Sequence, residues 1–325
     1  MSPTPARPPS MHLTEPIEIR PCRPDDLLRF APLTAQGLSS TLRDGITGAE
    51  QDRYCHLGLW LGDIPAGLLL SRRSSMVPGE QELLSVMVLP LLRRQRLALR
   101  LLEAFAARMK AEGRTQLATQ WSERLPQGEA FAGLLAASGW QPAAKARLRM
   151  AFHVGERHDA LPQHGMLMQQ LQRRGLVLKS LASLDALEEA GLSVATTRLT
   201  AHHALPAWAD PQLWQDGLDR EVSQVLLGAG GEPLGWLLAQ HHSAPGRWTL
   251  PCGWLSPSVH WHVALIAGMG ELLARLEEIR GSQSSLILQP TTTEGAKVCR
   301  LLDRRFRPYA MWADSILESH KPLLD

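Results

Sequence analysis

The pattern of apolar and polar positions is most regular between Glu82 and Met109. An apolar run over residues 83–89 is long enough for a buried strand, and Pro90 ends it because proline cannot donate to a strand ladder. After a basic turn, apolar residues recur at spacings of three and four, which predicts a helix with one buried face. They are Leu97, Leu101, Leu102, Phe105 and Met109. The stretch therefore predicts a strand, a tight turn and a helix in succession.

The tight turn is a candidate anion site. The first turn of a helix has backbone N–H groups without partners, and the helix dipole favours negative charge there. Four arginines lie on or beside this turn, at positions 93, 94, 96 and 100. A phosphate or pyrophosphate is the ligand that this arrangement predicts. The alternative is a strand–helix junction whose arginines only face water, since the turn contains no glycine.

The rest of the first half alternates between strand and helix patterns, with turn signals such as Gly62-Asp63 and Pro78-Gly79 between them. The predicted order is β, one or two α, β, β, β, α, β, α, β. The expected strands are 17–20, 56–61, 67–70, 83–89, 115–121 and 146–152. The expected helices lie within 27–55, from 97 to a C-cap at Gly113, and at 129–137.

The second half weakly repeats the first. Landmark residues recur at nearly one offset, at 167 for the two prolines (257 − 90), 168 for two glycines (235 − 67) and 166 for two aromatic residues (306 − 140). The second set of strands is expected at 176–181, 222–227, 234–240, 248–255, 286–289 and 309–316, with helices at 263–279 and 294–302. The matching turn, 257–263, has no arginine and no glycine. We therefore expect a degenerate second copy, kept for packing or for acceptor binding.

The turn and its strand resemble the acyl-CoA loop of the GCN5-related N-acetyltransferase (GNAT) superfamily, V-x-P-x-x-[RQ]-x-x-G-x-[GA]. Val88, Pro90, Arg93 and Ala98 match, and Arg96 stands where the first glycine is expected. The resemblance implies an α/β (α+β) fold of two tandem GNAT-like domains, each a mixed, largely antiparallel sheet flanked by helices. The expected divisions are a disordered arm (1–16), a first domain (17–154, loop at 88–98), a linker (155–174) and a second domain (175–325).

The resemblance also implies a co-substrate, acetyl-CoA or a longer acyl-CoA, and no metal. The donor would be bound by the end of the strand and by the turn, at Val86, Met87, Val88, Arg93, Arg94, Gln95, Arg96, Leu97 and Ala98. A backbone N–H at 86–88 would bind the oxyanion. Glu80 and Glu82, at the entrance of the strand, are candidate general bases; the alternative is that both are solvated loop charges. The family's frequent tyrosine acid aligns near Leu135, which cannot donate a proton.

Composition adds few constraints. The net charge of +2 does not call for a nucleic-acid partner. The four cysteines are scattered without metal-ligand spacing, which favours free thiols in a reducing compartment. Residues 1–16 lack the apolar core of a signal peptide, and no apolar run reaches the ~20 residues of a membrane span. The expectation is a cytoplasmic protein.

Other candidates for chemistry give weaker signals. The histidine pairs 202–203 and 241–242, with His260 and His262, have no third metal ligand at a fixed spacing. Ser122 and Cys252 have no adjacent base, so neither is a strong nucleophile candidate. The ten tryptophans against two tyrosines are unusual. Core packing explains them, and the alternative is an apolar groove for a long acyl chain or an aromatic acceptor.

Two hypotheses follow. The first is an N-acyltransferase in which an amine acceptor, a small molecule or a peptide, attacks the thioester directly. The second is a non-catalytic binding or regulatory protein that kept the fold and lost turnover, which the missing glycine and tyrosine favour. A weaker third hypothesis assigns a nucleic-acid role to the basic turn. The sequence indicates neither the acceptor nor the oligomeric state.

Overall fold

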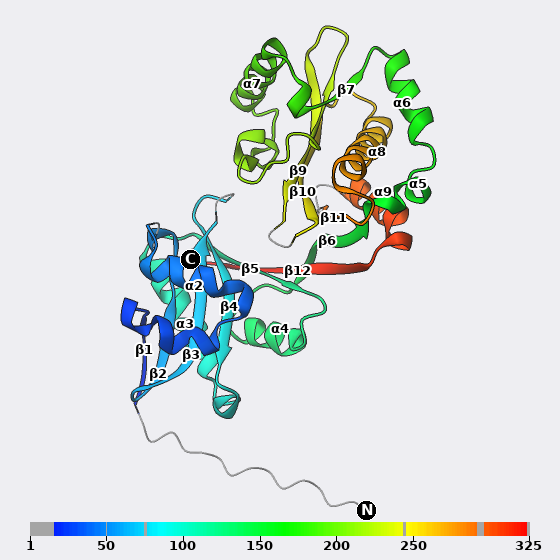
Figure 1. Ribbon diagram of the computed structural model, residues 1–325. Coiled ribbons are helices and arrows are strands. Elements are labelled where there is room, and N and C mark those ends of the chain that lie inside the picture. Colours follow the sequence, from blue (N-terminus) through cyan, green and yellow to red (C-terminus); the bar gives the residue numbers. More distant parts are fainter. Residues whose placement is uncertain (1–15, 50, 75–76, 243–244, 291–295, 324–325) are drawn as a thin grey trace, which may run out of the picture. The chain divides into compact units, whose positions relative to one another are not determined.

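The computed structural model describes residues 16–49, 51–74, 77–242, 245–290 and 296–323. The expected disordered arm therefore lies, except for Pro16, outside the described residues. The chain forms two compact units (Figure 1). The first comprises residues 1–121, 125–144 and 318–325, and the second comprises 122–124 and 145–317. Within the described ranges, no helix is both long enough and apolar enough to cross a membrane.

The first unit has the predicted order of elements. Its strands are β1 (Ile17–Pro21), β2 (Leu57–Leu61), β3 (Ile64–Arg73), β4 (Glu80–Val88) and β5 (Gln116–Ser122). Its helices are α1 (Leu27–Phe30), α2 (Ser39–Thr47), α3 (Leu97–Ala111) and α4 (Gly128–Ala137). Each of these elements overlaps a predicted one.

The sheet of the first unit is antiparallel except where β4 and β5 run parallel. Leu42 of α2 packs with Leu68 and Leu70 of β3 on one face. On the opposite face, a Cβ atom at Gly67 would lie 3.2 Å from the Leu101 side chain of α3. Helices therefore cover both faces, and β4 lies inside the sheet between them.

The two halves of the sequence exchange their last strands. The predicted closing strand of the first half exists as β6 (Ala144–His153). From Lys145 onward, however, it belongs to the second unit, where it pairs antiparallel with β11 (Ser285–Leu288). The compact units therefore do not follow the consecutive ranges that the sequence suggests.

The end of β12 (Trp312–Pro322) supplies the last strand of the first unit. The Leu323 N–H donates to the Thr115 carbonyl at 2.9 Å, and the Gln141 N–H donates to the His320 carbonyl at 2.8 Å. Residues from the end of the chain thus complete the sheet that contains β4.

The second unit repeats the architecture. Its remaining strands are β7 (Val177–Ser180), β8 (Gln224–Leu227), β9 (Pro233–His241) and β10 (Arg247–Leu255). Its helices are α5 (Arg157–Ala160), α6 (His164–Arg173), α7 (Ala186–Ala201), α8 (Trp261–Arg280) and α9 (Ala296–Phe306). As in the first unit, one adjacent pair, β10 with β11, runs parallel among antiparallel neighbours.

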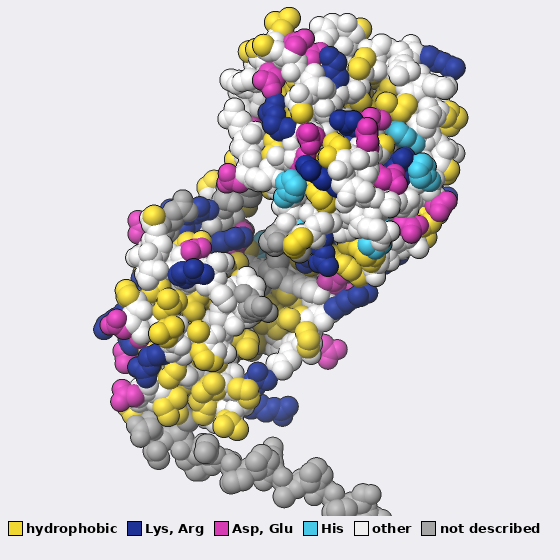
Figure 2. All heavy atoms as spheres, in the orientation of Figure 1, with side chains coloured by type: hydrophobic (Ala, Val, Ile, Leu, Met, Phe, Trp, Pro, Cys, Tyr) yellow, Lys and Arg dark blue, Asp and Glu magenta, His cyan; other side chains and the backbone are white. Residues whose placement is uncertain are grey.

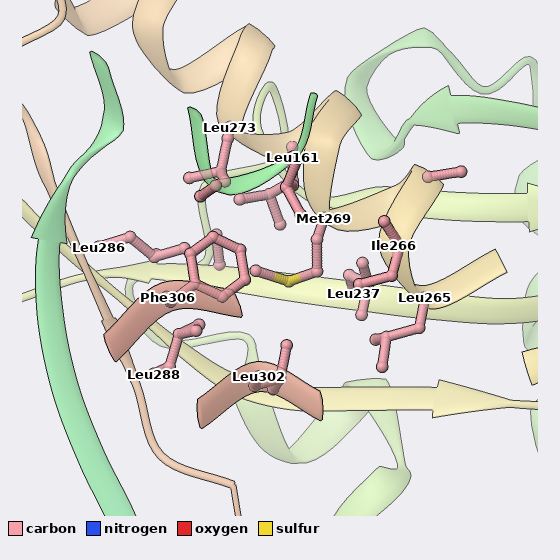
Figure 3. Packing of buried hydrophobic residues seen from close by; sticks show 14 of the residues in the cluster. Leu161, Leu237, Leu265, Ile266, Met269, Leu273, Leu286, Leu288, Leu302 and Phe306 are labelled. Atoms are coloured by element: carbon pink, nitrogen blue, oxygen red, sulfur yellow. The ribbon is translucent and has the colours of Figure 1, made fainter. Parts of the chain in front are cut away.

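The main core of the second unit lies between its sheet and the helices α8 and α9 (Figure 3). Met269 of α8 and Phe306 of α9 are fully buried there against Leu286 of β11. The opposite face carries a second cluster with Trp236 and Trp254, whose ring centroids lie 4.7 Å apart. These two tryptophans are core residues, as the packing interpretation expects.

The stretch expected as a linker, 155–174, contributes to this core. It contains α5 and α6, and Leu167 and Leu171 of α6 are buried in the main cluster. Helix α6 lies close against α8, since a Cβ atom at Gly270 would lie 2.2 Å from the His164 ring. The helix was not predicted, because the stretch is mostly polar and two leucines one helical turn apart give a weak apolar pattern.

We expect a chain that ends after Leu317 to lose at least about 2 kcal/mol of stability in the first unit. Each backbone hydrogen bond contributes about 1 kcal/mol, and the burial of Leu323 contributes a further 1.5–3 kcal/mol or so. Hydrogen exchange should show faster exchange of the β5 amides, with those of β10 unchanged. A chain ending after Leu323 is the matched control. Unchanged protection of β5 after the longer truncation would contradict the strand exchange.

Candidate functional site

The second half of β4 has a hydrogen-bonded neighbour on only one side. On the β3 side, pairing runs along the strand to Gly67↔Val88. On the β5 side, the described pairing starts at Glu80↔Gln116 and ends at Leu83↔Thr119. The two parallel strands therefore part beyond Leu83, and residues 84–88 border an open side of the sheet.

Backbone donors face this open side. The Leu89 N–H donates to the Ala66 carbonyl at 2.9 Å, in register with Leu68↔Met87. Because N–H groups alternate along a strand, the N–H of Met87 also faces β3. The N–H groups of Val86 and Val88 then face away from β3, toward the open side. These are the residues expected to provide an oxyanion donor.

The register also fixes which side chains line each face. Cross-strand pairs share a face, and β4 pairs with β3 as Leu68↔Met87, Leu70↔Ser85 and Arg72↔Glu82. Leu68 and Leu70 pack toward α2. Met87, Ser85 and Glu82 therefore lie on the α2 face, along the edge of the open side. Met87 is 38% exposed, so the end of β4 reaches solvent on this face.

The turn after β4 contains two residues in the left-handed conformation, which favours glycine. Arg94 and Arg96 have positive φ angles of 62° and 59°. Arg96 is the N-cap of α3 and makes no side-chain capping hydrogen bond. The Arg100 N–H donates to the Arg96 carbonyl at 3.1 Å, which starts the helix. The left-handed conformation at position 96 is thus kept although an arginine occupies it.

The residues of the turn divide into buried anchors and exposed charges. Leu92 and Leu97 are buried on either side of it. The four arginines are exposed, and Arg93 Nε lies 3.4 Å from the Val88 carbonyl. A ligand at this turn would therefore meet the backbone of Val88 and Leu97 and the charged side chains of the arginines. The predicted donor-binding residues at 86–98 form one continuous strand-to-helix segment.

The two candidate bases have different environments. Glu82 is 29% exposed on its side chain and pairs with Arg72 of β3 at 3.0 Å. Glu80 is buried, and Gln116 Nε2 donates to its Oε2 at 2.5 Å. Glu82 thus lies nearer to the open side along the strand and is the more accessible of the two.

The exchanged strand brings one further titratable residue, His320, to Glu80, and a second, Glu318, to His320. His320 Nδ1 lies 3.8 Å from Glu80 Oε2, and His320 Nε2 lies 3.3 Å from Glu318 Oε2. No sequence pattern predicted a role for these two residues. Positions 80 and 320 are far apart in the chain, and no local pattern around His320 indicates the contact.

The alternative chemical candidates find ordinary explanations. Burial raises the pKa of the Cys252 thiol to about 12, so it stays protonated at neutral pH. Ser122 Oγ accepts a hydrogen bond from the Arg124 N–H at 3.0 Å. His241 Nε2 lies 3.3 Å from the buried Asp219 carboxylate. In the part of the chain that the structure describes, no group of three or more His, Cys, Asp or Glu residues is placed to hold a metal ion.

The corresponding turn in the second unit has a different geometry. His260, the N-cap of α8, has a φ of −70° and therefore does not adopt the left-handed conformation of Arg96. Ser256 and Ser258 close the turn through a 2.8 Å contact between their hydroxyl groups. No arginine occurs between 257 and 263. The second turn thus differs from the first in both backbone shape and charge.

No protein-family model and no curated protein sequence matches the chain. Solved structures do. A tandem GNAT protein from the clavulanic acid biosynthesis pathway has a TM-score of 0.61 and 13% sequence identity over 95% of this chain and 99% of that chain. A GCN5-related N-acetyltransferase from Sphaerobacter thermophilus has a TM-score of 0.60 and 14% identity over 96% and 98%. The chain has a tandem GNAT fold.

A third structure extends the comparison. The GCN5-related glucosamine N-acetyltransferase region of a fungal multi-domain GH3 β-N-acetylglucosaminidase has a TM-score of 0.64 and 11% identity. The match covers 94% of this chain and 38% of that chain. The expected fold class, two tandem GNAT-like domains with largely antiparallel sheets, is confirmed. At these identities the similarity concerns the tandem GNAT fold and does not transfer a substrate.

Replacing Arg96 by glycine should raise the free energy of unfolding of the first unit by up to ~1 kcal/mol. A non-glycine residue in the left-handed region destabilises the folded state by roughly 1–2 kcal/mol, and glycine removes this strain. Glycine also increases the entropy of the unfolded chain, which offsets about 0.5–1 kcal/mol of the gain. Denaturant unfolding measures the change.

Arg100→Gly is the matched control, because Arg100 is also exposed but lies inside α3. It should lower stability by about 1 kcal/mol. Equal losses in the two variants would show that position 96 does not adopt a glycine-like conformation.

Proposed function

We propose that the first unit is an N-acyltransferase that moves an acyl group from acyl-CoA to an amine. The observation that carries the proposal is the open side of β4, which leads directly into an arginine-rich turn and the N-terminus of α3. An extended thioester donor fits such a segment. Its amide-containing arm matches the unpaired strand edge, and its phosphates match the helix N-terminus and the arginines.

Binding would place the reacting carbonyl beside β4. Arg93, Arg94 and Arg96, together with the first N–H groups of α3, would hold the pyrophosphate of acetyl-CoA or a longer acyl-CoA. The N–H of Val86 or Val88 would donate to the thioester oxygen. Such a donor stabilises the oxyanion that forms in the transition state more than the ground-state carbonyl.

The acceptor amine would approach from the α2 face, where Glu82, Ser85 and Met87 line the edge. The amine nitrogen attacks the thioester carbon, the C–S bond breaks as the tetrahedral intermediate collapses, and the amine proton passes to Glu82. Four residues of extended strand separate Glu82 from Val86 by about 13 Å, so one or more water molecules would relay this proton. Leu135 is buried, and the leaving thiolate would therefore take its proton from solvent.

A non-catalytic binding protein is the second candidate. The ion pair between Arg72 and Glu82 favours it, because Arg72 occupies the carboxylate that would otherwise receive the amine proton. Either candidate can bind a donor. Only the enzyme releases a thiol when an amine is present.

The surface charge does not favour a nucleic-acid partner. On the face shown in Figure 2, acidic and basic side chains are interspersed over the second unit, and the net charge of the chain is +2. A nucleic-acid surface usually concentrates Lys and Arg on one face or stripe. The arginines of the turn are better explained by a small phosphorylated donor.

Calorimetric titration of the protein with acetyl-CoA and with a long-chain acyl-CoA should show saturable binding of at least one donor. The double variant Arg93→Ala/Arg94→Ala should bind that donor at least ~10-fold more weakly, because even one lost charge-assisted hydrogen bond is worth about 1.5–3 kcal/mol. The control is Arg173→Ala/Arg174→Ala, a pair of exposed arginines in the second unit. No binding of either donor by the folded protein would contradict the acyltransferase proposal.

Glu82→Gln should lower thiol release from the bound donor by roughly 10²–10⁴-fold, with the donor Kd unchanged. The assay uses a panel of primary amines and follows the free thiol. Glu80→Gln is the matched control, since Glu80 is buried and held by Gln116. Equal losses in the two variants would contradict the assignment of Glu82, and donor binding without thiol release for any amine would favour the non-catalytic candidate.

A further inference from the structure

A polar cluster lies on the sheet of the second unit, on the face opposite the main core. Leu148 and Met150 of β6 are buried in that core, so Arg147 and Arg149 project to the opposite face. Ala313 of β12 packs against the same core. By the same alternation, the neighbours of Ala313, at 312 and 314, project to the face that carries the two arginines.

A direct contact supports this placement. The guanidinium carbon of Arg149 lies 5.4 Å from the centroid of the Trp312 ring, within the range of a cation–π contact. Arg147, Arg149, Trp312 and Asp314 are all only partly exposed. All four belong to the second unit. We name these four residues the β6–β12 cluster.

Three polar atoms of this cluster are buried without a partner. They are Nε of Arg147, Nε of Arg149 and Oδ1 of Asp314, and they make up three of the six such side-chain atoms in the described part of the chain. A buried donor or acceptor without a hydrogen bond lowers the stability of the fold, and such atoms are rare in native proteins. Here three such atoms, two donors and one acceptor, lie on two neighbouring strands. They indicate that a bound polar molecule provides the missing hydrogen bonds.

Nearby carboxylates do not fill this role. Lys145 precedes Arg147 by two residues on the same face of β6, and it holds Glu123 at 3.2 Å. Glu123 is further hydrogen-bonded by Ser315. Glu123 is therefore already engaged. The cluster itself contains two arginines and one aspartate, an excess of one positive charge.

We propose that the β6–β12 cluster binds a small carboxylate that also carries an ammonium or hydroxyl group, such as an α-amino or α-hydroxy acid. The Cα atoms of residues two apart on a strand lie about 7 Å from each other, so the long side chains of Arg147 and Arg149 can reach one shared carboxylate. The Asp314 Oδ1 atom accepts a hydrogen bond from the second group of the ligand. Trp312 provides an apolar flank for its short carbon chain.

The position of the cluster gives the second unit a role of its own. Leu192 and Leu199 of α7 cover the same face of the sheet farther along, against Trp236 and Leu238. Through the internal repeat, this face corresponds to the α2 face of the first unit, where Glu82 lies. The second unit thus lacks the arginine turn but retains a ligand site on the equivalent face. The inference does not depend on acyl transfer in the first unit.

The test is a titration of the full chain with three matched probes, L-alanine, L-lactate and propionate, followed by ligand-observed NMR and calorimetry. All three carry a carboxylate and a short chain, and only the first two carry a donor for Asp314. L-Alanine should bind more tightly than L-lactate, and propionate at least tenfold more weakly than L-alanine. Equal binding of L-alanine and propionate, or no binding of any probe to the folded protein, would overturn the proposal.

Variants locate the site. Arg147→Gln and Arg149→Gln should each weaken L-alanine binding at least tenfold, whereas Arg173→Gln, an exposed arginine of the same unit, should leave it unchanged. Asp314→Asn should remove the preference for L-alanine over propionate. If a variant unfolds, the relative affinities of the three probes for the wild-type protein still test the proposal. Binding that persists in both Arg147→Gln and Arg149→Gln would place the ligand elsewhere and refute the assignment.

Discussion

The proposed chemistry depends on one constraint in the first unit: β4 has hydrogen-bonded neighbours on both sides only over its first half. Buried backbone groups require partners. The unpaired N–H groups of Val86 and Val88 must therefore bind water or an extended ligand, as an exposed strand edge binds a peptide. Pro90 then turns the chain, so that the same segment offers strand donors for an amide-rich arm and a helix N-terminus for phosphate.

The exchange of last strands links this site to the end of the chain. A domain closed by its own β6 would have different residues beside β5. Here Glu318 and His320 lie there, and His320 contacts the buried Glu80. The first unit consequently cannot complete its sheet before residues 318–323 have been synthesised. Its folding therefore depends on contacts between residues far apart in sequence, which form slowly because loop closure is entropically costly.

The sequence predicted the elements well and the contacts between them poorly. Local patterns predicted β4 and α3 correctly. The signal for β4 is an apolar run followed by a proline, and the signal for α3 is an apolar stripe that includes Leu101, Leu102 and Phe105. Each pattern lies within a single segment of the chain. The exchange of β6 and β12 was not predictable in this way, since both strands have the same alternation whichever sheet they join. The role of α6 was also missed, because two leucines among glutamines and arginines give a weak stripe.

Among the candidate site residues, the backbone conformation was the harder part to predict. The motif placed Arg96 where a glycine is expected, and the missing glycine favoured the non-catalytic hypothesis. The structure keeps the left-handed conformation there, because residues on both sides are fixed: Leu92 and Leu97 are buried, and α3 begins directly after the turn. The packing of a turn's flanking residues can thus impose a conformation that the local residue disfavours.

The two units share one topology but differ in the turn before the long helix. In the second unit the turn before α8 is closed by Ser256 and Ser258, with no left-handed residue at its N-cap and no arginine. Nothing then requires the backbone to approach a phosphate. The sheet face is less easily lost, since its polar residues lie on strands whose other face forms the core. Arg147 and Arg149 alternate with Leu148 and Met150, so core packing that fixes the leucine and the methionine also holds the arginines in place. A binding site on a strand can therefore persist in a copy whose loop has changed.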